Sequence, residues 1–194
     1  MVLIMLPMWM NFLLRTYSWM AILENNGLLN QLFQKIGLIS LYNSIFGTDL
    51  SYFRMINTQG AVVLGMVYNY LPFMILPLHT TLSGIDKSYA EAAQDLGADK
   101  TTVFLKTTLP LSVSGILSGI TMVFIPTIST YAISQLLSNG KIFLFGDSIQ
   151  LSFEQGMYGV GSIMSLVMLV FVLLSNFVMN KFNRNNNAVR RSLW

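Results

Sequence analysis

The sequence predicts an all-α integral membrane protein with about four transmembrane helices. Of its 194 residues, 54% are hydrophobic and only 10% are charged, whereas about a quarter of the residues in a soluble domain are charged. The mean hydropathy is +0.60. Helices are the expected form of every span, because an open strand cannot satisfy its backbone polar groups in lipid. Four segments approach the roughly 20 apolar residues that a spanning helix needs: 1–23, 58–80, 111–133 and 158–180.

Polar residues interrupt the first of these segments. Asn11 and Arg15 lie within it, and a charge near the centre of a spanning helix costs about 2.5 to 3.5 kcal/mol on insertion scales. Arg15 therefore faces either a water-filled path or the outer interface, where Tyr17 and Trp19 would belong to an aromatic belt.

The loop 24–57 mixes apolar residues at helical spacing with polar ones. This pattern predicts a short helix lying on the membrane face. Two roles stay open for it: contact with a protein outside the membrane, or a lid packed on the spans.

The second and third spans both contain proline. Pro72 and Pro77 free backbone carbonyls in the second span, which also contains Asn69, and allow a kink there. In the third span, Gly115 and Gly119 form the Gly-x-x-x-Gly pattern that favours close helix packing. Pro126 follows. Hydroxyl groups after it would line a polar path in the outer half of the span, and the candidates are Thr127, Ser129, Thr130 and Tyr131.

Two carboxylates lie in the loop 134–157, Asp147 and Glu154. Either both are solvated, or they meet a cationic solute. Glu154 and Tyr158, four residues apart, could present a carboxylate and an aromatic face to an amine.

A polar island, 81–110, separates the second and third spans. Ser88 followed by Glu91 predicts a capping box at the start of a helix, and Gly97 supplies the left-handed conformation that ends one. Asp99 predicts the cap of a second short helix. That helix should end near Leu109, because a proline at 110 disfavours helical geometry in the residue before it.

The distribution of basic residues predicts the orientation of the chain. The island and the tail 183–194, counted with Lys181, hold seven Lys and Arg residues, against three in the other two loops. Cytoplasmic loops carry the excess of Lys and Arg. The island, the tail and both ends of a four-span domain 1–182 are therefore expected on the cytoplasmic side.

Composition also excludes several kinds of site. The chain contains no cysteine and one histidine, His79, which rules out disulfides and multi-histidine metal sites within it. Gly140-Lys141 lacks the Ser or Thr of a phosphate-binding loop. No paired carboxylates lie within the predicted spans, so an intramembrane enzyme is disfavoured, and nothing indicates a nucleic-acid partner.

The island resembles the EAA loop of ATP-binding cassette importer permeases. The resemblance rests on Glu91-Ala92-Ala93, Gly97 and Leu109-Pro110 at the family's spacing. It implies the type I importer permease fold, with a short cytoplasmic coupling helix that sits in a cleft of the ATPase subunit and transmits its closure to the spans. ATP would then bind to that partner, and this chain would need no cofactor.

Three further strings are similar to the first permease subunit of spermidine/putrescine importers: 15–19 (RTYSW), 26–30 (NGLLN) and 65–72 (GMVYNYLP). This resemblance covers nearly the whole chain. It implies a bacterial plasma-membrane subunit that imports polyamines together with an ATPase, a second homologous permease, an extracytoplasmic solute-binding protein and membrane lipid. Such permeases usually have six spans, and the four predicted here correspond to the last four.

Three readings of the function follow. The first is a working polyamine permease subunit, the second is a non-transporting truncated fragment or assembly partner, and the third is an importer of another small solute. A path for solute is expected at these residues: Arg15, Asn69, Thr127, Thr130, Tyr131 and Glu154.

Overall fold

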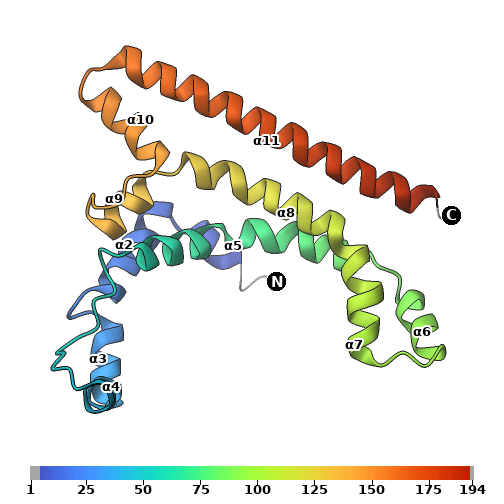
Figure 1. Cartoon of the computed structure of the whole chain (residues 1–194), viewed down its shortest axis with the longest axis horizontal. Helices are drawn as coiled ribbons and strands as arrows, with labels where there is room; N and C mark the ends of the chain where they lie inside the picture. The colour runs from blue at the N-terminus through green and yellow to red at the C-terminus, as the bar shows by residue number, and fades with distance from the viewer. Residues whose placement is uncertain (1–4, 193–194) are drawn as a thin grey trace. The chain divides into compact units, whose positions relative to one another are not determined.

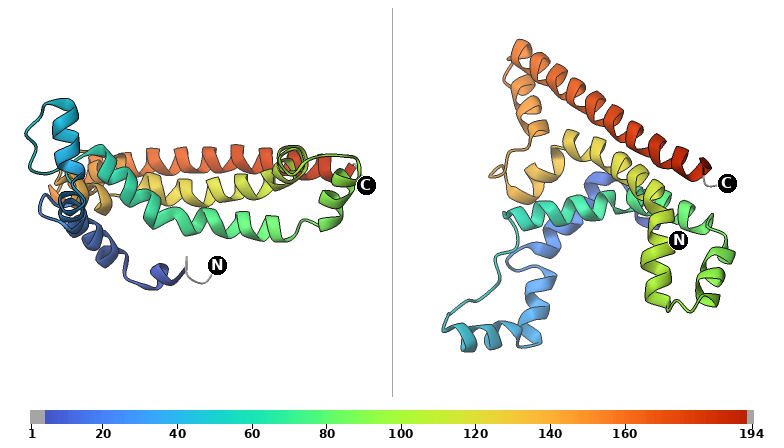
Figure 2. Two further views of the ribbon diagram at one scale, coloured as in Figure 1. Left: turned by 90° about the horizontal axis from the view of Figure 1, so that it is seen from below. Right: turned by 45° about the vertical axis from the view of Figure 1, so that its right-hand side comes forward.

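The structure is a computed structural model that describes the backbone of residues 5–192, with side chains described except at 6, 7 and 182–192. Every regular element in this range is a helix (Figures 1 and 2), as the sequence predicts. The chain divides into two compact units, Met1–Asn69 with Ile128–Ser162, and Tyr70–Thr127 with Ile163–Trp194. Long helices pass from one unit into the other, and each unit is described by itself.

Three helical segments among the described residues are long and apolar enough to cross a membrane: Gln59–Ser83, Lys100–Ser129 and Tyr158–Lys181. They overlap the second, third and fourth predicted spans, although Lys100–Ser129 begins and ends earlier in the chain than the third predicted span. The first predicted span begins outside the described residues. Within it lie the 3-10 helix η1 (Leu6–Trp9) and helix α2 (Phe12–Leu23), whose 12 residues extend about 18 Å, less than the bilayer core.

Among the described residues, the first unit contains η1, five shorter α-helices and the beginning of α5 (Gln59–Ser83). After α2 come α3 (Leu28–Lys35) and α4 (Leu38–Phe46), joined at Gly37, whose φ of 76° lies in the left-handed region. This confirms that the loop 24–57 is helical and makes it a pair of helices. Later in the chain the unit adds α9 (Ala132–Ser138) and α10 (Phe145–Glu154).

Helix α9 forms the core of the first unit. Ile133 and Leu137 on this helix have no exposed surface, and α2 packs against it. Gly65 on α5 leaves room for Leu137, because a Cβ at this position would overlap the leucine side chain. The rings of Trp19 and Tyr68 meet edge to face at 5.2 Å and join α2 to α5.

The second unit contains the remainder of α5, the helices of the polar island, most of α8 (Leu109–Ser129) and most of α11 (Tyr158–Ser192). The predicted Gly-x-x-x-Gly packing is confirmed. A Cβ at Gly115 would lie 2.5 Å from Thr81 Oγ1, and one at Gly119 would lie 3.2 Å from the Met74 carbonyl oxygen. The two glycines therefore bring α8 directly onto the backbone of α5.

Two ends differ from the predicted limits of the spans. Helix α8 stops at Ser129 and α9 starts at Ala132, so the third predicted span, 111–133, is broken at Thr130 and Tyr131. Helix α11 continues to Ser192 through most of the predicted tail. Pro72, Pro77 and Pro126 all lie inside helices.

Candidate functional site

The polar island folds into the short helix α6 (Lys87–Asp95), which carries the predicted coupling residues. Its N-cap is Asp86, whose Oδ1 accepts a hydrogen bond from the Ser88 backbone N–H at 3.0 Å. The prediction that Ser88 caps the helix is therefore wrong by two residues. Asp86 is the stronger choice because its carboxylate accepts that bond and also opposes the positive end of the helix dipole.

Gly97 ends α6 as predicted. Its φ is 84°, in the left-handed region. The Ala98 N–H donates to the Ala93 carbonyl at 3.1 Å and the Gly97 N–H donates to the Gln94 carbonyl at 2.8 Å, which is the Schellman arrangement. A Cβ at Gly97 would meet nothing within 4 Å. Backbone conformation, and not space, thus requires glycine here.

The second helix of the island is continuous with the third span. Asp99 caps α7 (Lys100–Val103) through a bond from the Thr102 N–H at 3.3 Å, as predicted. The helix does not end near Leu109, however. A π-helical turn, η2 (Phe104–Thr108), leads directly into α8, and the Leu109 N–H donates to the Phe104 carbonyl, five residues back.

The π-helical turn accounts for this failed prediction. In an α-helix the ring of Pro110 would clash with the carbonyl of residue 106. Widening the preceding turn by one residue changes the hydrogen-bond register, which is how π-bulges are accommodated inside α-helices. The proline therefore alters the helix locally without ending it.

Helix α6 offers an exposed surface. It contains no buried residue, and Glu91 and Ala92 are exposed while Ala93 is half-buried. Leu96, at the C-cap, is 90% exposed. Within the second unit, α6 contacts only the neighbouring α7 and η2 among the more extensive helix pairings. Leu109 and Pro110 lie at the start of α8 and not on α6.

The two capping carboxylates have lowered pKa values. The hydrogen bond from the Ser88 backbone, with a further one from its side chain, holds the pKa of Asp86 below its ordinary value of 3.8. Bonds from the Thr102 side chain and backbone do the same for the pKa of Asp99. A lowered folded-state pKa means that the cap stabilises the helix above pH 3.8 and that this contribution is lost as the pH falls through the lowered value.

We expect Asp86→Ala to loosen the first turn of α6. Amide hydrogen exchange of residues 87–91 in the membrane-embedded protein should become faster than in the parent, and Asp95→Ala, at the far end of the same helix, should leave it unchanged. In the parent, protection of these amides, corrected for intrinsic exchange, should fall as the pH drops below about 3.8 towards the lowered pKa of Asp86. Equal protection in the parent and in Asp86→Ala would contradict the capping role.

Two of the predicted path residues have buried polar atoms without a hydrogen-bond partner. On α2, Arg15 Nε and Nη1 are both of this kind. On α5, Asn69 is only 2% exposed; its Nδ2 donates to the Gly65 carbonyl at 2.9 Å, and its Oδ1 has no partner. The Trp19–Tyr68 contact joins these two helices one turn from Arg15 and one residue from Asn69.

The other predicted path residues lie in different surroundings. Thr127 Oγ1 donates back to the Val123 carbonyl at 2.7 Å. Thr130 is buried at the break after α8, and Tyr131 next to it is 41% exposed. Glu154, at the end of α10, is exposed and accepts a bond from Gln150 at 3.0 Å. The ring of Tyr158 contacts Phe153, with centroids 6.2 Å apart.

Asp147 is the polar residue that sequence reasoning placed least well. A solvated loop carboxylate was one expectation, yet Asp147 is 2% exposed. Its Oδ2 accepts bonds from the Ser134 hydroxyl at 2.6 Å and the Leu144 N–H at 2.7 Å, while Oδ1 has no partner. Gly146 permits this burial, because a Cβ there would lie 2.5 Å from the Thr130 carbonyl oxygen. The carboxylate thereby ties α10 to α9.

Replacing Asp147 with Ala should destabilise the protein by about 1 to 3 kcal/mol, the cost of leaving buried donors unpaired. For a chain of this size the melting temperature should fall by about 2 to 4 °C for each kcal/mol. The matched control is Glu154→Ala, which removes an exposed carboxylate from the same helix. Equal melting temperatures for the two variants would contradict the tie between α9 and α10.

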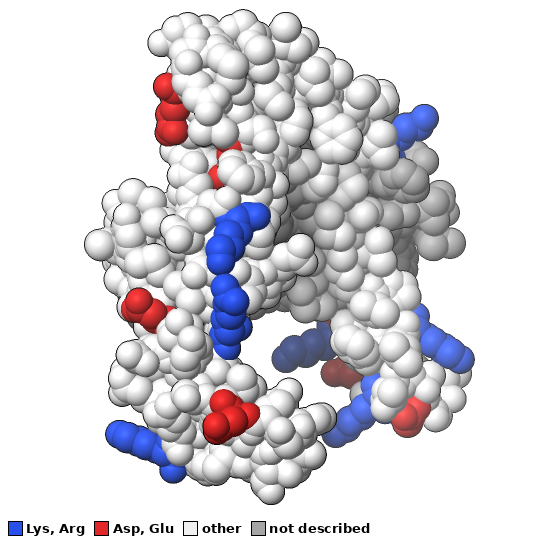
Figure 3. Space-filling model, turned by 60° about the vertical axis from the view of Figure 1, so that its left-hand side comes forward, with Lys and Arg blue, Asp and Glu red and all other residues white. Residues whose placement is uncertain are grey.

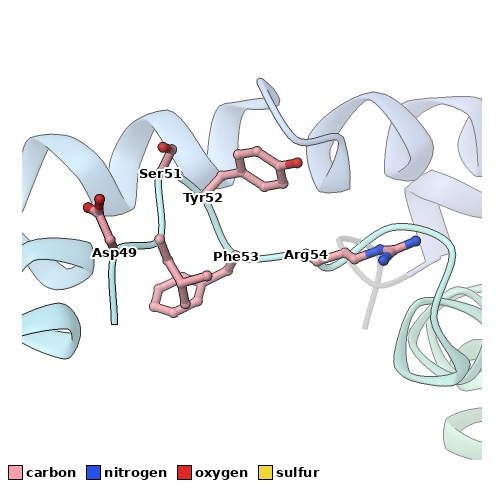
Figure 4. Close-up of a pocket in the computed structure, with 6 residues that line it drawn as sticks. Asp49, Ser51, Tyr52, Phe53 and Arg54 are labelled. Atoms are coloured by element: carbon pink, nitrogen blue, oxygen red, sulfur yellow. The ribbon is translucent and has the colours of Figure 1, made fainter. Parts of the chain in front are cut away.

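A surface pocket of about 460 Å³ lies elsewhere in the first unit, lined by the continuous segment Asp49 to Arg54 (Figure 4). It contains none of the predicted path residues. Among the described residues no group of three or more His, Asp or Glu side chains could hold a metal ion.

A protein-family match and individual similar proteins both cover most of the chain and indicate the same kind of protein. The family described as "Binding-protein-dependent transport system inner membrane component" matches residues 1–188. The chain is 34% identical over 183 residues to the spermidine/putrescine transport system permease protein PotB of Haemophilus influenzae, covering 94% of this chain and 60% of that protein.

Two other relatives support the same grouping. The Escherichia coli PotB protein is 34% identical over 151 residues, or 78% of this chain and 51% of that protein. A PotB homolog of Mycoplasma pneumoniae is 36% identical over 113 residues, or 57% of this chain and 40% of that protein. The chain thus spans about half to three fifths of the length of the two PotB proteins. By its helical fold, its apolar spans and this match, it belongs to the family of binding-protein-dependent transport system inner membrane components.

Proposed function

We propose that this chain forms part of the permease of an ATP-driven importer of spermidine and putrescine in a bacterial plasma membrane. The observation that carries the proposal is α6, a capped helix with no buried residue, set in the loop between two candidate spans and bearing Glu91-Ala92-Ala93 followed by the left-handed Gly97. The substrate is proposed from the names of the PotB relatives.

The coupling role is assigned to Glu91, Ala92, Ala93 and Gly97, with Leu109 and Pro110 at the start of α8. In this proposal α6 docks into a separate ATPase subunit on the cytoplasmic side. The basic residues of the island favour a cytoplasmic position for this loop. ATP hydrolysis takes place in that subunit. A second homologous permease completes the path, and an extracytoplasmic solute-binding protein delivers the solute.

The path is assigned to the polar groups of the first unit together with Thr127. Ammonium groups donate hydrogen bonds, so oxygen acceptors suit a polyamine. Asn69 Oδ1 is such an acceptor in a buried position, and Glu154 is one at the surface. Thr130 and Tyr131 add hydroxyl groups at the break after α8. Arg15 contributes a positive charge, which opposes tight retention of a cation.

Transport by reconstituted protein tests the proposal. The chain as given, and a version extended by any residues encoded in frame upstream, are each co-expressed with the neighbouring ATPase, second permease and binding protein and placed in vesicles. ATP-dependent uptake of labelled spermidine by either version supports the proposal. Copurification of the ATPase without uptake would instead favour a non-transporting assembly partner, and uptake of a different solute would replace the polyamine assignment.

A further inference from the structure

The hydroxyl of Ser134 on α9 lies within hydrogen-bond distance of two oxygen atoms at once. Its Oγ is 2.6 Å from the Tyr131 carbonyl oxygen and 2.6 Å from Asp147 Oδ2 on α10. A serine hydroxyl carries one hydrogen, whereas a peptide carbonyl and an ionised carboxylate carry none and only accept. If Asp147 were ionised, one of these two short contacts would therefore join two oxygen atoms with no hydrogen between them.

The second carboxyl oxygen of Asp147 also bears on the charge of this residue. Oδ1 has no hydrogen-bond partner, and the residue is 2% exposed, so bulk water does not reach it. In an ionised carboxylate, Oδ1 would carry part of the negative charge. Burying an unpaired charge is far more costly than burying an uncharged carbonyl oxygen. The geometry thus favours the uncharged form of the side chain.

Among the described residues, no basic group is paired with Asp147. Helices α8 and α9 contain no ionisable side chain. The ionisable side chains on the other segments around α9 and α10 are Arg15, Tyr17, Glu24, Arg54, Tyr68, Tyr131, Lys141, Glu154 and Tyr158. The cations among them form no ion pair with Asp147, whose bonds in the described part of the chain come from Ser134 and Leu144. Charged side chains are also sparse over the face of the molecule that Figure 3 shows.

The two helix ends beside Asp147 have opposite effects on its charge. Asp147 lies in the first turn of α10, where the helix dipole favours a negative charge. A Cβ at the preceding Gly146 would lie 2.5 and 2.9 Å from the carbonyl oxygens of Thr130 and Ser129. This turn therefore packs on the C-terminal end of α8, where the dipole opposes a negative charge. Neither helix end decides the protonation state, so the number of hydrogens available around Ser134 does.

We propose that Asp147 is a proton-binding site and is a neutral carboxylic acid in the folded protein at neutral pH. Oδ2 takes a proton from the solvent and donates it in a hydrogen bond to Ser134 Oγ, and the Ser134 hydroxyl donates in turn to the Tyr131 carbonyl. Each 2.6 Å contact then contains one hydrogen. The Leu144 N–H still donates to Oδ2 at 2.7 Å, and Oδ1 becomes an uncharged carbonyl oxygen.

This proton makes the contact between α9 and α10 dependent on pH. Its release would leave a buried, unpaired negative charge and remove the hydrogen from one of the two contacts of Ser134, so α10 would be held less firmly on α9. An unfolded chain releases the proton of an aspartate above a pH of about 3.9. Because the folded protein keeps this proton, its stability should decrease as the pH rises. The caps at Asp86 and Asp99 depend on pH in the opposite direction and below about pH 3.8.

Thermal unfolding of the full chain and of Asp147→Asn between about pH 5 and pH 8 tests the proposal. The variant cannot take up the proton, so the difference between the two melting temperatures isolates its contribution. The melting temperature of the parent relative to that of the variant should fall by about 3 to 5 °C for each unit of pH until the proton is released. A difference that stays constant or increases with pH would overturn the proposal, because an ionised Asp147 gives that result.

Infrared spectroscopy covers the case in which Asp147→Asn does not fold. The parent, in a detergent without ester groups, should show at neutral pH the carbonyl stretching band of a protonated carboxylic acid. Glu154→Gln, which removes the exposed carboxylate of the same helix, should retain this band, and Asp147→Asn, where it folds, should lack it. Absence of the band from the parent, or its loss in Glu154→Gln, would contradict a proton at Asp147. Neither measurement depends on a solute or on transport.

Discussion

Charge reversal by Glu91→Arg is expected to lower ATP-driven uptake more than about tenfold while the protein remains folded in the membrane. Glu91 is exposed and takes no part in the caps of α6, which are made by Asp86 and Gly97. Truncating or reversing a charge that becomes buried and paired on docking costs about 2 to 5 kcal/mol. A loss of that size in the affinity for the ATPase accounts for the expected loss of uptake.

The helix itself should tolerate the change. An arginine at 91 stands four residues before Asp95, an i, i+4 pair of opposite charge, while it also faces Lys87 one turn earlier. These effects nearly cancel, and exposed substitutions usually change the free energy of unfolding by less than about 0.5 kcal/mol. The melting temperature should accordingly match that of the parent.

Uptake and ATPase copurification should be measured together, with Asp49→Arg as the control. Asp49 is an exposed acidic residue beyond the other end of α5, so its reversal should retain both properties. Normal uptake by Glu91→Arg would remove α6 from the coupling role. Loss of uptake in both variants would show a general effect of added positive charge.

Replacement of Gly115 by Leu should have the largest effect on folding. The first added atom, Cβ, would lie 2.5 Å from Thr81 Oγ1, 2.7 Å from Thr81 Cβ and 3.1 Å from the Pro77 carbonyl oxygen. The last of these is backbone and cannot rotate away. Overpacking a close contact costs about 1 to 3 kcal/mol, and more where the backbone must move. We expect a melting temperature lower by about 2 to 12 °C and a reduced yield of protein in the membrane.

Gly159→Leu is the matched control, because a Cβ at Gly159 on α11 would meet nothing within 4 Å. The two variants add the same side chain to a predominantly apolar helix. If both retain the parent melting temperature, the packing of α8 on α5 is not tight in the protein. If the melting temperature falls equally in both variants, the added bulk and not the Gly115 contact is responsible.

The features of the fold that depend on neighbouring residues, such as span length and helix caps, could be predicted from the sequence. Apolar length located three spans, and the requirement for a positive φ located the end of α6 at Gly97. Asp99 was identified as a cap because a carboxylate two or three residues ahead of free N–H groups is a strong acceptor there. Asp86 meets the same criterion. The spacing of Ser88 and Glu91 is more specific to a capping box, however, and led to the wrong prediction that Ser88 is the cap.

Features that depend on distant parts of the chain were not predictable in this way. Asp147 is buried because Gly146 meets the Thr130 carbonyl and Ser134 meets the carboxylate, and neither contact leaves a periodic signal in the sequence. The continuation of the helix through Pro110 depends on one extra residue in the preceding turn, and no spacing rule distinguishes that solution from a break. Among the predicted path residues, the buried polar atoms without a hydrogen-bond partner at Arg15 and Asn69 became visible only in the structure.

The continuity of α7, the π-helical turn and α8 has a mechanical consequence. From Lys100 to Ser129 the chain is one helical rod, so a force applied to the island is transmitted along the third span without the slack that a flexible linker would introduce. The widened turn at Phe104–Thr108 is the one section of that rod whose hydrogen bonds follow the π-helical register. Under the coupling role proposed for α6, a displacement of that helix would therefore reach the third span through this turn, whose geometry determines how α7 and α8 are aligned.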